Sequence, residues 1–233
     1  MIDVVIPLGT GSVWQNTELR YCLRSIEKHL KGYGKIIIVG EFPSWLKECY
    51  HIPVKDNEAY AVKAKNIFNK IIKSFEKSTD TIIFFNDDHF LLQDVQAADF
   101  PYHHKGTLAE GKQSTTYQKF KDNTRELLES LGKEIYNFDT HCPIVYEKSK
   151  FLELKQFDFN KPYCYVIKSL YCNFNGITGE YFKDCKINER LSKEQVLNAI
   201  NNRHYFSMGE NGISKGLLDV LEELYPNKSK YEK

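Results

Sequence analysis

An apolar run that stops at two adjacent aspartates most limits what this chain can fold into. Residues 81–85 read TIIFF, and Asn86, Asp87 and Asp88 follow at once. Such a run is typical of a buried strand in an α/β sheet, where ligands bind just beyond the carboxyl ends of the strands. Two neighbouring carboxylates repel each other unless a cation or hydrogen-bond donors stabilise them. The pattern predicts a Mg²⁺ or Mn²⁺ site, and its alternative is a solvated acidic turn.

The first hundred residues alternate between strand-like and helix-like patterns. Strands are expected over 2–8, 35–40, 52–54 and 81–86, and helices over 16–30, 43–50 and 57–77. Asn16 is the expected N-terminal cap of the first helix. Alternation at this spacing favours parallel strand pairs joined by right-handed crossovers. We therefore predict an α/β fold, a Rossmann-like and mostly parallel sheet flanked by helices.

The second half of the sequence is less regular. A polar loop is expected over 101–112, helices over 113–131 and 213–224, and a short strand over 143–146. Ser192 and Gln195 form the pattern of a capping box for a helix to about Asn201. No linker or repeat divides the chain, which predicts one domain over residues 1–233. Residues 1–100 would form the half that contains the aspartate pair, and residues 101–233 the second half.

Composition narrows the function classes. Lys and Arg number 32 against 31 Asp and Glu, a net charge of +1, so no global field favours nucleic acid or an acidic membrane. No apolar run approaches the roughly 18 residues that cross a bilayer, and the N-terminus lacks the pattern of a signal peptide. The six cysteines show no C-x-x-C spacing. A reducing, cytoplasmic location is expected.

Several residues near the predicted strand ends are candidates for binding a nucleotide or its phosphates. The loop after the first strand lacks the third glycine of G-x-G-x-x-G, because Trp14 stands there, which disfavours a dinucleotide-binding dehydrogenase. A tight turn and solvated polar faces are the alternatives for these residues. The candidates are Leu8, Gly9, Thr10, Gly11, Glu41, Lys65, Asn66 and Asn86.

A histidine beside a carboxylate in the second half is a candidate general base. His141 follows Asp139 by two residues just before a predicted strand, and a carboxylate can fix the tautomer of an imidazole that accepts a proton. A structural turn with an incidental histidine is the alternative. Further candidates for phosphate or acceptor contacts are Arg20, Lys168, His204, Lys228 and Lys230.

These segments together resemble a GT-A-type nucleotide-sugar transferase, and the match is closer to the Stealth family of sugar-1-phosphate transferases. The segments that carry the resemblance are IDVV at 2–5, ELRYCLRSIE at 18–27, IIIV at 36–39, PSWL at 43–46, FNDD at 85–88 and HCP at 141–143. The first region departs from the family, because the usual Thr-Trp-Val does not follow it. The nearest match to the family's fourth region is FSMGEN at 206–211.

The resemblance implies a donor, an acceptor and a cation, with residues 1–100 as the nucleotide-sugar and metal half and residues 101–233 as the acceptor half. The donor would be a nucleotide-sugar, UDP-linked, with Mg²⁺ or Mn²⁺ held by Asp87 and Asp88, and the acceptor would be a glycan or another hydroxyl compound. Glycosyl transfer is the first expectation. The alternatives are sugar-1-phosphate transfer in capsule or surface polysaccharide synthesis, a non-catalytic nucleotide- or glycan-binding module, and a DNA-modifying glycosyltransferase of phage origin.

Overall fold

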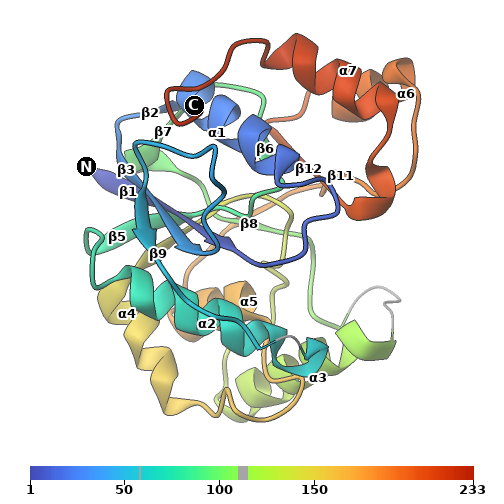
Figure 1. Cartoon of the computed structure of the whole chain (residues 1–233). Helices are drawn as coiled ribbons and strands as arrows, with labels where there is room; N and C mark the ends of the chain where they lie inside the picture. The colour runs from blue at the N-terminus through green and yellow to red at the C-terminus, as the bar shows by residue number, and fades with distance from the viewer. Residues whose placement is uncertain (58, 110–114) are drawn as a thin grey trace.

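A five-stranded sheet lies at the centre of the computed structural model, which describes residues 1–57, 59–109 and 115–233 (Figure 1). Its strand order is β4-β3-β1-β5-β9. The strands are β1 (Ile2–Leu8), β3 (Tyr33–Gly40), β4 (Tyr50–Ile52), β5 (Thr81–Phe84) and β9 (Ile144–Glu147). All neighbouring pairs are parallel except β5 with β9, which are antiparallel. The sheet thus joins a strand from the second half of the chain to four from the first.

The side chains of the central strands divide between two hydrophobic clusters, one on each face of the sheet. Val4 and Ile6 of β1 belong to one cluster and Val5 to the other. In β3, Ile36 and Ile37 divide in the same way. This alternation follows from the two-residue period of a strand, and it explains why the strand segments are apolar throughout.

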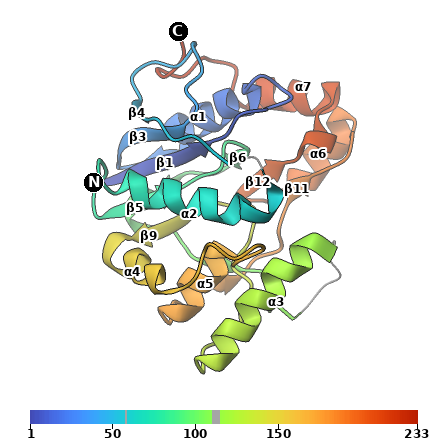
Figure 2. The ribbon, with the colours of Figure 1, turned by 60° about the horizontal axis from the view of Figure 1, so that its bottom comes forward.

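Helices cover both faces (Figures 1 and 2). On one face lies α1 (Thr17–His29), with α6 (Lys193–Ile200) and α7 (Lys215–Leu224) extending the same cluster. On the other face lie α2 (Lys63–Ser74), α4 (Lys148–Glu153) and α5 (Ile167–Phe174), and α3 (Thr115–Ser130) packs against α5. A mostly parallel sheet between helices confirms the predicted α/β, Rossmann-like class.

Short strands bring the C-terminal third of the chain to the end of β5. The strand β6 (His89–Leu91) follows the aspartate pair and pairs antiparallel with β12 (Tyr205–Met208), which pairs parallel with β11 (Lys186–Ile187). Two further pairs are β2 (Leu30–Lys31) with β7 (Val95–Gln96), and β8 (His103–His104) with β10 (Glu180–Tyr181). Single 3₁₀ turns are η1 (Tyr60–Val62), η2 (Ala97–Asp99), η3 (Leu154–Gln156) and η4 (Glu210–Gly212).

The helix predicted over 43–50 does not form. The C-terminal segment takes the backbone groups that a helix would use, because Lys47 N–H donates to the Tyr231 carbonyl and Lys233 N–H donates to the Trp45 carbonyl. Leu46 also forms an antiparallel bridge with Glu232. The third strand accordingly covers Tyr50–Ile52 rather than 52–54.

Two helix starts also differ from prediction. Asn16 does not cap α1, since its backbone is left-handed at φ 58°, and the Ser12 hydroxyl accepts the N–H groups of Trp14 and Asn16 instead. The helix predicted over 57–77 begins only at Lys63, because the preceding turn is 3₁₀. The predicted capping box is confirmed, with Ser192 and Gln195 bonded reciprocally at the start of α6.

The segment 101–112, predicted as a loop, contains the short strand β8. Residues 110–112 of this segment, and the first two residues of the helix predicted over 113–131, lie outside the described residues. Among the described helices, none combines the length and the apolar character needed to span a membrane.

Candidate functional site

Two adjoining cavities open at the carboxyl ends of β1 and β5. The larger has a volume of about 870 Å³ and extends from the loop after β1 to the aspartate pair, and the smaller has a volume of about 370 Å³. Four residues line both cavities, namely Lys63, Ile67, Asn86 and Lys186. The shared lining places the two cavities next to each other, with Lys63 of α2 and Lys186 of β11 at their border.

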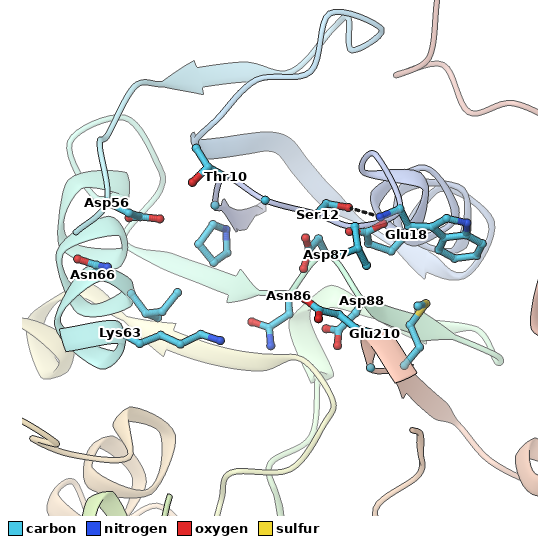
Figure 3. A pocket seen from close by; sticks show the side chains of 18 of the residues that line it. Thr10, Ser12, Glu18, Asp56, Lys63, Asn66, Asn86, Asp87, Asp88 and Glu210 are labelled. Carbon is cyan, nitrogen blue, oxygen red and sulfur yellow. Dashed lines mark hydrogen bonds between the residues drawn. The ribbon is translucent and has the colours of Figure 1, made fainter. Parts of the chain in front are cut away.

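The aspartate pair forms part of the wall of the larger cavity (Figure 3). Burial raises the pKa of Asp87 to about 7, and the neighbouring charges of Asp88 and Glu18 add to the effect. Burial also raises the pKa of Asp88, although Lys186 and His141 oppose that shift. The carboxyl groups of a solvated acidic turn would not be shifted by burial in this way, so the pair is not a solvated turn.

The carboxylates at this end fit the chemistry of Mg²⁺ or Mn²⁺. Asp88 Oδ1 and Glu18 Oε2 are buried and lack a hydrogen-bond partner among the described residues. In the described ranges, no three His, Cys, Asp or Glu side chains are grouped closely enough to form an ion site by themselves. Mg²⁺ is commonly held by one or two carboxylates, with substrate phosphates and water completing its shell.

The residues predicted to bind a nucleotide divide between the cavity and its surroundings. Gly9, Thr10, Gly11, Asn66 and Asn86 line the larger cavity. Leu8, Glu41 and Lys65 do not line it. Leu8 is buried, and its carbonyl oxygen accepts hydrogen bonds from the Lys70 ammonium and the Glu41 N–H. The Glu41 side chain is exposed. On the helix that contains Lys65, it is Lys63 that lines the cavity.

His141 lines the smaller cavity, and its orienting carboxylate is Asp184. The Nδ1 atom of His141 lies 2.6 Å from Asp184 Oδ2, and the backbone N–H of His141 donates to Asp184 Oδ1 at 2.8 Å. The Lys105 ammonium also donates to Oδ2, at 3.0 Å. Buried Lys168 donates to the carbonyl oxygens of Thr140 and Cys142 on either side of the histidine, both at 2.7 Å. The histidine is therefore fixed in backbone and ring.

The prediction that Asp139 orients His141 is wrong. The Asp139 side chain accepts a hydrogen bond from the Tyr117 hydroxyl, while its own N–H donates to Asn137. Burial would raise the pKa of Asp139, but Lys105, Lys168 and the Tyr117 hydroxyl outweigh it and lower the pKa. Asp139 still lines the smaller cavity as a half-buried carboxylate.

Four of the five predicted phosphate or acceptor contacts lie outside both cavities, and Lys168 alone lines one. Arg20 donates to Glu232 and stacks over Trp45. The Lys228 ammonium donates to the carbonyl oxygen of Lys233, and Lys230 lies over the Tyr33 ring. His204 is an exposed loop residue whose carbonyl accepts from Leu92.

Several lining or supporting residues are not among the predicted site residues. They are Glu18, Asp56, Lys70, Lys105, Asp184 and Lys186. Most reach the site from distant segments or sit within ordinary helices and turns. For Glu18, the signal available was its place at the start of the helix that follows the glycine loop.

The fold and the cavities define an α/β protein whose site lies at the carboxyl edge of a Rossmann-like sheet. The sequence is similar to N-acetylglucosamine-1-phosphotransferase subunits alpha/beta of Mus musculus, at 33% identity, and of Homo sapiens, at 32%, over 107 residues each. The matched part covers 39% of this chain and 8% of either relative. No protein-family profile matches the chain. The similarity gives distant support to the Stealth resemblance and points to a transferase.

Proposed function

We propose that this chain is a transferase that moves a sugar phosphate from a nucleotide-sugar to a hydroxyl acceptor. The observation that carries the proposal is the junction of the two cavities, lined by Lys63, Asn86 and Lys186. The aspartate pair lies on one side of this junction and His141 on the other. A donor diphosphate at the junction would have a cation site and a base on opposite sides of its reacting phosphorus.

The junction suits a diphosphate by charge. Lys63 approaches it from α2 and Lys186 from β11. The charge of Lys63 partly offsets the rise in the pKa of Asp87, and the charge of Lys186 does so for Asp88. Ammonium groups bind phosphate oxygens as point charges, and the Asn86 amide can donate to another oxygen. Asp87 and Asp88 would hold Mg²⁺ or Mn²⁺, which would neutralise charge on the diphosphate as the leaving group departs.

His141 would act as the general base. Asp184 binds Nδ1–H, so the neutral ring directs its unprotonated Nε2 away from Asp184 and can take the proton of an acceptor hydroxyl. The acceptor oxygen would then form a bond to the sugar-proximal phosphorus, and the bond from that phosphorus to the bridging oxygen would break. A nucleoside monophosphate leaves, and the lysines stabilise charge on the transferred phosphoryl oxygens.

Glycosyl transfer, the first expectation from sequence, would use the same groups. It would break the bond at the anomeric carbon and release a nucleoside diphosphate. The similarity to a phosphotransferase moves the preference to phosphoryl chemistry. The two basic side chains at the junction support the same preference, since charge develops there on equatorial phosphate oxygens.

The test is a screen of nucleotide-sugars with Mn²⁺ and a panel of glycan acceptors, following the released nucleotide. The proposal expects acceptor-dependent release of a nucleoside monophosphate, lost in Asp87→Ala and in His141→Ala. Release of a nucleoside diphosphate would assign glycosyl transfer instead. Binding without any release across the panel would favour the non-catalytic module.

A further inference from the structure

One end of the larger cavity contains a carboxylate that no step of the proposed reaction uses. Asp56 lies there with Asn66 beside it, across the cavity from Glu18 and Asp87 (Figure 3). Asn57 lines the same end, and its backbone exchanges hydrogen bonds with the Asn66 side chain. These polar groups lie at the opposite end of the cavity from the aspartate pair (Figure 3).

A buried lysine holds Asp56 in place. Lys70 is 1% exposed, and its ammonium donates to Asp56 Oδ2 at 2.7 Å and to the Leu8 carbonyl oxygen at 2.8 Å. Gly40 leaves room for this arrangement, because a Cβ at that position would lie 2.9 Å from Lys70 Nζ and 2.0 Å from the Leu8 oxygen. Burying an ammonium group costs free energy unless it is paired and hydrogen-bonded, and the two contacts of Lys70 offset part of that cost.

The second carboxylate oxygen of Asp56 has no hydrogen-bond donor in the part of the chain that the structure describes. Oδ1 is buried and lacks a hydrogen-bond partner among the described residues, although Asp56 lines the cavity. A buried acceptor without a donor is unfavourable, and in native proteins it commonly marks a place where a ligand or water completes the contact. A fixed carboxylate repels phosphate, so the complementary ligand group is an N–H or O–H donor.

We propose that Asp56 selects the nucleobase of the donor by accepting a hydrogen bond from a ring N–H. This inference rests on the proposed function, because a nucleotide whose diphosphate lies at the junction would extend its nucleoside toward one end of the cavity. Uracil presents N3–H and guanine presents N1–H, whereas cytosine N3 and adenine N1 are acceptors. Asp56 would therefore favour uracil or guanine nucleotides and disfavour cytosine and adenine nucleotides.

The experiment is calorimetry of the full chain with UDP, GDP, CDP and ADP in the presence of Mn²⁺. UDP or GDP is expected to bind about tenfold or more tightly than CDP and ADP, and the stronger of the two identifies the base. In Asp56→Asn, the amide oxygen stays on Lys70 and the NH₂ group replaces Oδ1. The acceptor becomes a donor, so affinity for the preferred nucleotide should fall and affinity for CDP should rise. Asp80→Asn, at a side chain that is 88% exposed, is the matched control.

The outcomes separate this inference from the proposed function. Equal affinity for all four nucleotides, or an unchanged affinity ratio in Asp56→Asn, overturns base selection and leaves the transferase proposal standing. If the four nucleotides bind equally but dUDP binds weakly, Asp56 Oδ1 accepts a hydrogen bond from the ribose 2′-hydroxyl, and this result also overturns base selection. Absence of binding by all four nucleotides overturns both. The ratio of nucleotide affinities in the wild type tests the proposal without any variant. A melting curve checks that Asp56→Asn is folded.

Discussion

Asp184 accepts two hydrogen bonds from His141, one from the backbone N–H and one from the ring, although the residues are 43 positions apart. Burial would raise the pKa of Asp184, but the bonds from His141 and the charge of Lys105 outweigh it and hold the pKa well below its usual range. The carboxylate therefore stays ionised over the working pH range. It keeps the proton of the neutral imidazole on Nδ1 and leaves Nε2 as the base.

Replacing Asp184 should impair catalysis more than donor binding. In Asp184→Asn, the amide can no longer accept from both N–H groups and Lys105 with the strength of a carboxylate, so the tautomer and the orientation of His141 are lost. We expect kcat to fall by about 10² or more, with a smaller change in KM for the donor. Steady-state rates across pH 5–9 measure this.

The chain supplies a matched control for that substitution. His29 and Asp94 form another His–Asp contact, at 2.8 Å, outside both cavities. Asp94→Asn should leave kcat and its pH profile unchanged. A rate for Asp184→Asn close to that of Asp94→Asn would remove Asp184 from the mechanism.

The raised pKa of Asp87 predicts how stability depends on pH without a divalent cation. Its folded-state pKa of about 7 exceeds the ordinary 3.8, so the folded state binds more protons between these values. Stability from this group is fully present near pH 4 and is lost as the pH rises toward 7, by an amount on the order of 4 kcal/mol. Asp87→Asn should therefore raise the melting temperature of the metal-free protein more at pH 8 than at pH 5, and change it little below about pH 4.

The same group links the cation to pH. Mn²⁺ binds the ionised carboxylate, so its stabilising effect on the wild type should be larger at pH 8 than at pH 5.5 and should be absent in Asp87→Asn. Asp80→Asn, at an exposed turn, is the control. An equal Mn²⁺ shift in wild type and Asp87→Asn at pH 8 would place the ion elsewhere.

Elements that form because of residues close together in the sequence could be predicted. The apolar runs at 2–8, 35–40 and 81–86 became central strands, because a strand buried on both faces needs apolar side chains in both directions. The capping box at Ser192 was predictable for the same local reason. The segment 43–50 was not, because its backbone groups bond to the C-terminal segment nearly two hundred positions away.

Within the site, the aspartate pair had a local signal and its partners did not. Lys186 lines both cavities from a two-residue strand, and Asp184 contacts His141 from the segment before that strand, so no periodicity marks either residue. On a helix, Lys63 and Asn66 share a face that Lys65 does not, and these two residues line the larger cavity.

The two lysines at the junction should contribute to donor binding. Lys63→Ala and Lys186→Ala each remove a charge that faces the proposed diphosphate, so the KM for a nucleotide-sugar should rise by roughly tenfold or more. Lys65→Ala is the matched control on the same helix, since this side chain does not line either cavity. Steady-state kinetics at 50 and 200 mM salt measure the effect. Equal KM values for the Lys63 and Lys65 variants would contradict the placement of the diphosphate.

Lys168 should stabilise the segment that contains His141. Its side chain is 7% exposed, and Lys168→Met would leave the carbonyl oxygens of Thr140 and Cys142 without their donor. Because unsatisfied buried acceptors are costly, the free energy of unfolding should fall by about 2 to 4 kcal/mol. Urea denaturation measures this loss. Lys148→Met, which removes an exposed ion pair with Asp80, should cost no more than about 1 kcal/mol. Equal stability of the two variants would show that the two carbonyl groups find water or another donor when the ammonium is removed.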